Sequence, residues 1–166
     1  MLSATIAEHT TCVGEVSASK ETAIDFPRGL LGFEGYRKYA LIAESGQEPF
    51  VHLRSLDEPS LEFLLVNPRL FFPHYKVEVD RREIAELDAP DIRGLTTWTI
   101  VTVPEDWSEM SANLQGPLLI NPQNGRGKQV VLVHGPYTTR HYLLEGLDKC
   151  ASRVKRVQEA AAVPQM

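Results

Sequence analysis

The residue types that carry out catalysis are present in this sequence, but their spacing does not match any active site. A serine nucleophile of the hydrolase type needs a tight Gly-x-Ser-x-Gly turn, and no serine here has that setting. The histidines are scattered, without a His-x-His or His-x-x-x-His pair that would place two metal ligands on one face. Acidic pairs such as Asp57 and Glu58 are ordinary on an acidic surface. The sequence therefore predicts a protein that is not an enzyme and holds no metal or cofactor.

The segment Asn124–Lys128 combines two glycines with a lysine, as a phosphate-binding loop does. It lacks the Gly-x-x-x-x-Gly-Lys-[Ser/Thr] spacing, and no helix is expected after it. An Asn-Gly pair favours the reversal of two antiparallel strands. The favoured interpretation is a hairpin turn.

Aromatic and asparagine side chains are better candidates, and the function they suggest is contact with another protein. The run Leu70–Tyr75 carries more aromatic surface than a loop needs, so Phe71, Phe72 and Tyr75 either anchor an interface or close one end of the fold. Asn113 and Asn121 flank an apolar strand, where they contact a partner or bridge backbone groups at the strand ends.

A loop near residue 30 offers a further candidate surface. Pro27-Arg28-Gly29 turns the chain after a short strand, and Gly32 adds a second point of backbone freedom. Two interpretations remain open: the loop presents Phe33 and Glu34 to a partner, or it is a corner that buries Phe33.

Composition and charge limit which classes of protein this chain can belong to. A chain of 166 residues with 43% hydrophobic and 23% charged residues is typical of one globular domain. No apolar run approaches the ~20 residues of a membrane-spanning helix, and the first residues lack a secretory signal, so the cytoplasm is the expected location. Cys12 and Cys150 form no Cys-x-x-Cys pair, which favours reduced thiols.

The net charge of -5 disfavours binding to nucleic acid, because phosphates are repelled. Charge is uneven along the chain: residues 1–147 carry 13 basic and 20 acidic side chains, whereas residues 148–166 carry four basic and two acidic ones. An acidic body suits a basic partner.

Short alternating runs, separated by turn signals such as Asn67-Pro68 and Asn124-Gly125, predict a mostly β fold: a small antiparallel barrel-like domain. The predicted strands are Ala23–Phe26, Tyr39–Ala43, Phe50–Arg54, Leu61–Val66, Tyr75–Val79, Thr96–Val103, Leu118–Ile120 and Gln129–His134.

Two helices interrupt this pattern. Arg81–Leu87 contains good helix formers and predicts a short helix. After His141, apolar residues recur at steps of four and three, which predicts a second helix. We expect residues 1–147 to form the barrel-like protein-binding domain and residues 148–166 a C-terminal helical tail with a frayed end, packed on the barrel or binding a partner.

Four segments, spread across most of residues 1–147, carry a distinctive combination of residues: Ile24–Glu34, Pro49–Pro59 continuing into Leu61–Pro68, Thr102–Pro104, and Ser111–Asn121. Together they resemble the flagellar assembly factor FliW family. The family pattern reads Phe-Pro-x-Gly-Leu-Pro-Gly-Phe-Glu in the first segment and Leu-Gln-Ser in the second. This chain departs from it at Leu31, where proline is usual, and at Arg54, where glutamine is usual.

The resemblance implies a small, mostly β protein that binds flagellin in the bacterial cytoplasm. It also implies binding to CsrA, the basic RNA-binding translational repressor, so that repression of flagellin synthesis is relieved. Two other functions stay open on the sequence alone. One is a barrel that binds a small molecule or carbohydrate on the aromatic residues of Phe71–Tyr75. The other is an enzyme whose groups, such as His134 and His141, converge only in space.

Overall fold

Nine strands form one continuous sheet in the computed structural model, which describes residues 19–147. Both the N-terminal residues 1–18 and the predicted tail, residues 148–166, lie outside the described residues. In chain order the strands are β1 (Ser19–Asp25), β2 (Lys38–Glu44), β3 (Phe50–Ser55), β4 (Glu62–Val66), β5 (Thr96–Thr102), β6 (Ser111–Ala112), β7 (Leu118–Asn121), β8 (Arg126–Gln129) and β9 (His141–Tyr142).

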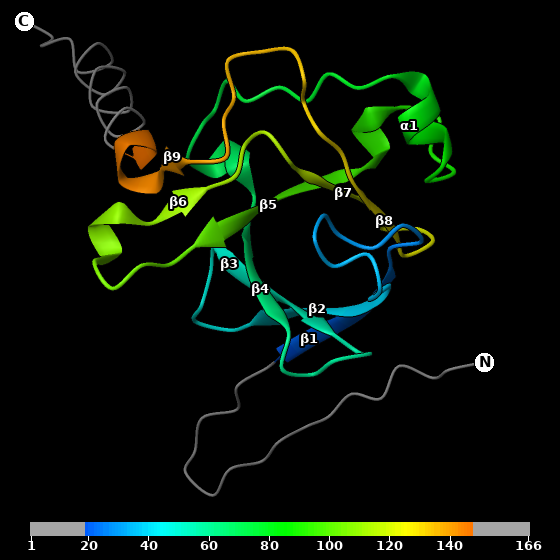
Figure 1. Cartoon of the computed structure of the whole chain (residues 1–166), viewed down its shortest axis with the longest axis horizontal. Coiled ribbons are helices and arrows are strands. Elements are labelled where there is room, and N and C mark those ends of the chain that lie inside the picture. The colour runs from blue at the N-terminus through cyan, green and yellow to red at the C-terminus, as the bar shows by residue number, and fades with distance from the viewer. Residues whose placement is uncertain (1–18, 148–166) are drawn as a thin grey trace, which may run out of the picture.

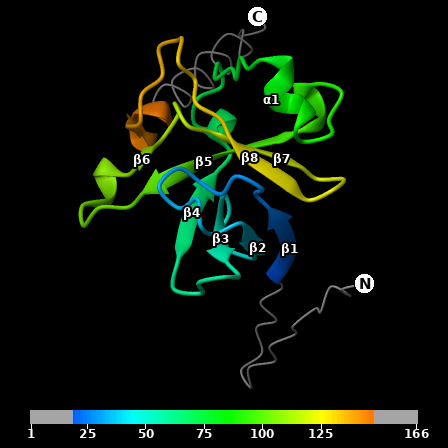
Figure 2. The same ribbon diagram turned by 45° about the vertical axis from the view of Figure 1, so that its right-hand side comes forward.

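The sheet closes into a barrel. Its strand order runs β4-β3-β2-β1-β8-β7-β5, and β4 also pairs with β5, so these strands complete a ring from which β6 and β9 continue beyond β5. β1–β4 lie on one side of the barrel and β5, β7 and β8 on the other (Figure 1, Figure 2). All pairings are antiparallel except β1 with β8, which meet at the single pair Asp25 and Arg126. The predicted barrel-like, mostly β fold is confirmed.

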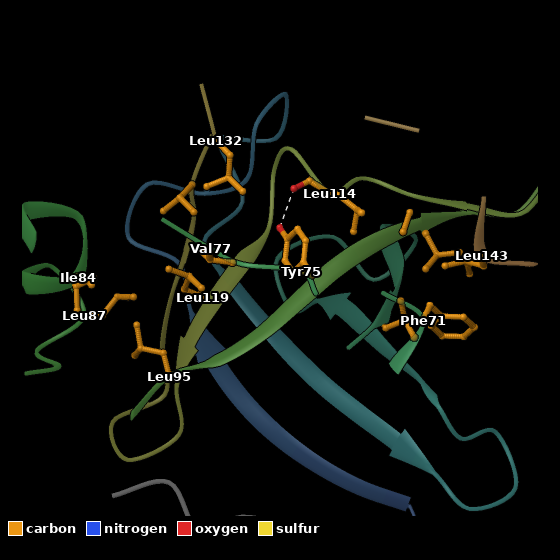
Figure 3. Packing of buried hydrophobic residues seen from close by; sticks show 14 residues of the cluster. Phe71, Tyr75, Val77, Ile84, Leu87, Leu95, Leu114, Leu119, Leu132 and Leu143 are labelled. Carbon is orange, nitrogen blue, oxygen red and sulfur yellow. Dashed lines mark hydrogen bonds between the residues drawn. The ribbon is translucent and has the colours of Figure 1, made fainter. Parts of the chain in front are cut away.

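Two clusters of buried side chains fill the interior. One lies among β1–β4 and β7 and includes Phe26, Tyr39 and Leu53. The other includes Leu119 of β7, Leu132, and residues of the segment that follows β4, such as Tyr75, and Figure 3 draws its members. Burying each large apolar side chain contributes roughly 1.5–3 kcal/mol, which makes these clusters the main source of stability.

Most of the predicted strands are present, but two are wrong. Tyr75–Val79 alternates buried and exposed residues without joining the sheet. Gln129–His134 contributes only Gln129 to β8; beyond it, the backbone N–H groups of Val130 and Leu132 donate to Pro117 O at 3.0 Å and Gln115 O at 2.8 Å. Tyr75–Val79 has no neighbouring strand among the described residues. Residues 130–132 continue the register of β7 and β8, but their hydrogen bonds are not returned, because Pro117 has no N–H and the N–H of Gln115 donates to Thr138 O. The short strands β6 and β9 were not predicted.

The predicted helix Arg81–Leu87 is confirmed in shorter form as α1 (Arg81–Ala85). Asp80 begins it, because its Oδ1 accepts from the N–H of Arg82 at 3.1 Å. The chain also becomes helical from Leu143 to Leu147, where the described residues end. Three short 3-10 turns complete the fold: η1 (Pro68–Leu70), η2 (Ile92–Gly94) and η3 (Trp107–Glu109). No helix within residues 19–147 is long and apolar enough to cross a membrane.

Candidate functional site

The loop between β1 and β2 is folded tightly back on itself. Gly29 has a φ of +66°, and a Cβ atom there would lie 2.6 Å from Glu34 Cα, so only glycine allows this close approach. Further on, the N–H of Phe33 donates to Leu30 O at 2.8 Å, and Gly32 has a φ of +84°. These are the features of a type II turn with Leu31 and Gly32 at its centre.

This turn places Phe33 and Glu34 at the surface. Of the two interpretations of the sequence, presentation to a partner requires this exposure, whereas a corner that buries Phe33 does not. Phe33 is 37% exposed and its ring packs edge-on against Phe63 of β4, with 5.1 Å between ring centres. Glu34 is exposed, and its Oε1 accepts from the N–H of Gly32 at 3.0 Å. That hydrogen bond lowers the pKa of Glu34, so the carboxylate is negative at neutral pH.

Gln129, at the end of β8, connects this loop to a second turn. Its Oε1 accepts from the N–H of Leu31 at 2.9 Å, and its Nε2 donates to Gly116 O at 3.0 Å. Asn113 holds the second turn, because its Oδ1 accepts from the N–H groups of Gln115 at 3.1 Å and Gly116 at 2.9 Å. We call Leu31, Phe33, Glu34, Asn113 and Gln129 the loop–turn surface.

Leu31 and Gln129 were not among the predicted site residues. Leu31 is 57% exposed, and together with Phe33 it makes the apolar part of the loop–turn surface. A lone glutamine at the end of a strand carries no signal of its bridging position. Leu31 was noted only as a departure from the family pattern; the structure adds that it donates a backbone hydrogen bond, which proline cannot do.

The predicted aromatic residues lie away from this loop, and two of the three are buried. Phe71 is 6% exposed and Tyr75 is 3% exposed. Tyr75 donates its hydroxyl to Leu114 O at 2.7 Å, as Figure 3 shows. Phe72 is half-buried, with its ring 5.9 Å from that of His141. Packing therefore removes Phe71 and Tyr75 from direct contact with a partner, and also from the platform that the carbohydrate alternative needs.

Asn121 is likewise buried and is bonded within the chain. Its Nδ2 donates to Leu87 O at 2.8 Å, and its Oδ1 accepts from the N–H of Gln123 at 3.0 Å. This is the bridging of backbone groups at a strand end that was one of its two interpretations. Asn113 is half-buried at the loop–turn surface.

Arg54, the second departure from the family pattern, belongs to a cross-strand group on the barrel wall. Its Nε donates to Glu62 Oε2 at 2.8 Å, and His52 Nδ1 lies 2.7 Å from Glu62 Oε1. Partial burial pushes the pKa of Glu62 upward, but the hydrogen bonds from Arg54 and His52 outweigh burial and leave that pKa below its ordinary value.

The two histidines proposed for an enzyme lie in different surroundings, and His134 shares its groove with Glu78, Asp80 and Glu83. His141 Nε2 accepts from the N–H of Thr138 at 2.9 Å and lies against Phe72 and Tyr137, whereas His134 lines a groove beside α1. Within residues 19–147, no three or more His, Cys, Asp or Glu side chains gather closely enough to hold a metal ion.

Comparison with known proteins agrees with the resemblance seen in the sequence. The model of the family described as FliW protein matches residues 7–143. A flagellar assembly factor FliW of Alkaliphilus metalliredigens is 38% identical over 149 residues, which cover 89% of this chain and 92% of the relative. One from Treponema denticola is 38% identical over 139 residues, covering 84% of this chain and 94% of the relative.

A solved structure extends the likeness from sequence to fold. It is a crystal structure of the flagellar assembly factor FliW, with a TM-score of 0.69 and 31% identity, covering 73% of this chain and 84% of the solved one. The match in family model, sequence and closed barrel spans most of the chain. This protein belongs to the FliW family of flagellar assembly factors.

Proposed function

We propose that this protein acts by binding, without catalysis, and that its partners are flagellin and CsrA in the bacterial cytoplasm. By capturing CsrA, it relieves the repression of flagellin synthesis. The observation that carries the proposal is the exposed pair Leu31 and Phe33, held on a tightly folded loop of a FliW-family chain. A rigid aromatic anchor beside a charged group is typical of an interface hot spot.

Charge supports the CsrA part of the proposal. The chain carries a net charge of -5, and Glu34 stands ionised beside Phe33 on the loop–turn surface. An acidic surface attracts a basic RNA-binding protein and speeds its association. Phe72 and Asn113 are further contact candidates, whereas Phe71, Tyr75 and Asn121 are buried.

Competition between the partners makes the protein a switch. Flagellin bound to this protein leaves CsrA free to repress, and loss of flagellin by secretion leaves this protein free to capture CsrA. Such coupling requires only that binding of one partner weakens binding of the other.

Calorimetry with purified flagellin and purified CsrA tests the proposal. Phe33→Ala is expected to weaken binding of at least one partner about tenfold or more, because truncating a hot-spot aromatic costs ~2 kcal/mol. Trp107→Ala is the matched control, since Trp107 is 73% exposed and lies on η3, outside the loop–turn surface. Equal affinities for wild type and Phe33→Ala would show that the interface does not include Phe33. A failure of the wild type to bind either partner would overturn the proposal.

A further inference from the structure

A groove lies outside the loop–turn surface, between the segment that leads into α1 and the segment that follows β8. Its volume is about 640 Å³, and it is partly open to solvent. One wall is Val77–Asp80, the other is Val130, Val131, Val133 and His134, and Glu83, Ile84 and Ile92 complete the lining. These two walls are the segments that the sequence predicted as strands and that the barrel leaves out of its ladder.

Backbone groups on both walls are unpaired within the described part of the chain. Val130 and Leu132 turn their N–H groups toward Pro117 O and Gln115 O. Since successive N–H groups of an extended segment point in opposite directions, those of Val131 and Val133 point away from residues 115–117. Neither has a hydrogen-bond partner within residues 19–147.

The opposite wall, Val77–Asp80, also has backbone N–H groups that are unpaired in the described part of the chain. The N–H of Lys76 donates to Tyr137 Oη at 3.0 Å, but the N–H groups of residues 77–79 have no partner among the described residues. An extended segment with unpaired backbone groups is a template on which a further strand can form.

Side chains define what kind of strand would fit. Val77, Val79, Val131 and Val133 make the groove apolar, and Val131 and Val133 remain 48% and 75% exposed. The other lining residues include the carboxylates of Glu78, Asp80 and Glu83, and no lysine or arginine from the described residues.

Part of this negative charge is left without a cation. Lys128 Nζ lies 2.6 Å from Glu83 Oε2 and 3.0 Å from Glu86 Oε2, so Glu83 is paired. Glu78 makes no ion pair within residues 19–147, and the carboxylate of Asp80 only caps α1. An apolar groove with unneutralised carboxylates at its rim complements a cationic, partly apolar ligand.

We propose that this groove binds an extended peptide segment of a partner protein, in which apolar residues alternate with lysine or arginine. The segment adds as a strand to the unpaired edge at Val131 and Val133. Its apolar side chains lie against the four valines, and its cations lie beside Glu78 and Asp80. Backbone hydrogen bonds supply affinity, and the alternation of side chains supplies selectivity.

Fluorescence polarisation with the full-length protein and a labelled peptide of alternating valine and lysine tests this proposal. We expect saturable binding that Val133→Lys and Glu78→Lys each weaken about tenfold or more, since both place a like charge against the peptide. Val133 and Glu78 are exposed, so neither change disturbs the core, and circular dichroism checks the fold. Val103→Lys is the matched control, because Val103 is 46% exposed and does not line the groove.

A second probe separates strand addition from simple charge attraction. N-methylation of alternate peptide nitrogens removes the donors that a new strand needs, and we expect it to abolish binding. The proposal is overturned if the methylated probe binds as well as the parent, or if both groove variants bind like the wild type. It is also overturned if a synthetic peptide of residues 148–166 displaces the probe at lower concentration, because the occupant would then be this chain's own segment.

Discussion

At the residue scale, one hydrogen bond gives Tyr75 a structural role. Its ring lies 4.7 Å from that of Tyr137, centre to centre, and its hydroxyl donates to Leu114 O at 2.7 Å in the buried cluster. Burial, with a smaller contribution from Tyr137, raises the pKa of Tyr75 far above its ordinary value. The hydroxyl therefore keeps its proton and remains a donor wherever the protein is folded.

Tyr75→Phe is expected to lower the free energy of unfolding by about 1–2 kcal/mol, because it leaves the buried Leu114 carbonyl without its donor. Urea denaturation followed by circular dichroism measures the change. Tyr137→Phe is the control, since it removes only the acceptor of the exposed Lys76 N–H and should cost less. A Tyr75→Phe protein as stable as the wild type would show that this hydrogen bond contributes nothing.

Leu31 occupies the first central position of the type II turn. Proline is favoured at that position. Leu31→Pro should gain about 0.4–1 kcal/mol by restricting the unfolded chain. It should also lose about 0.5–1.5 kcal/mol with the hydrogen bond to Gln129. We therefore expect a net change in the free energy of unfolding below about 1 kcal/mol.

A double-mutant cycle separates these two contributions. In a Gln129→Ala protein the hydrogen bond is already absent, so Leu31→Pro should stabilise by about 0.4–1 kcal/mol in urea denaturation. Destabilisation in that background would mean that the backbone at Leu31 does not suit proline.

At the scale of elements, Asp57 fastens the start of β2 to the turn between β3 and β4. The backbone N–H groups of Arg37 and Lys38 donate to its Oδ2 at 3.1 and 3.3 Å. The bond from Arg37 first, and then that from Lys38, lowers the pKa of Asp57 below its ordinary value. A lowered pKa means that the carboxylate stabilises the fold above its unfolded-state pKa of ~3.9 and loses this effect as the pH falls through the folded-state value.

Asp57→Asn should therefore be less stable than the wild type at pH 7, and the difference should shrink between about pH 5 and pH 3. Urea denaturation across this range measures it. Glu105→Gln is the control, because the Glu105 carboxylate makes no hydrogen bond within residues 19–147. A difference that stays constant with pH would contradict the assigned role of Asp57.

The whole molecule depends on how the barrel closes between β1 and β8, where the ladder is thinnest. One residue pair joins these strands, with the N–H of Asp25 donating to Gly125 O at 2.8 Å. The fully buried Phe26 ring covers this seam, and a Cβ atom at Gly127 would lie 2.5 Å from Phe26 Cε1. The barrel therefore closes at this seam through packing of the Phe26 ring against Gly127, which has no side chain.

Gly127→Ala is expected to destabilise the protein by about 1–3 kcal/mol, because the added methyl group overpacks the core and pushes Phe26 from the seam. Thermal and urea unfolding measure the loss. Gly94→Ala is the matched control, since a Cβ atom there meets nothing within 4 Å. Equal stabilities of the two variants would mean that the seam tolerates a wider separation.

The sequence predicted the parts of this fold that depend on local chemistry. Alternation in Phe50–Arg54 and Thr96–Val103 predicted β3 and β5, and the helix formers after Asp80 predicted α1. It failed at Tyr75–Val79 and Gln129–His134, where the alternation is equally good. Tyr75–Val79 has no neighbouring strand within residues 19–147, and residues 130–132 donate to Pro117 O and Gln115 O without receiving a bond in return. Alternation within a segment does not show which groups will lie opposite it.

The same division applies to function. The sequence by itself determined the fold class and, through motifs spread along the chain, the family, because these follow from local residue patterns. Only the tertiary structure decided that Phe33 is exposed while Phe71, Tyr75 and Asn121 are buried, and that Gln129 joins two distant turns. It alone placed two unpaired segments across a groove. The physical reason is that burial and hydrogen-bond pairing depend on which elements pack together when the barrel closes, and a linear pattern does not contain that information.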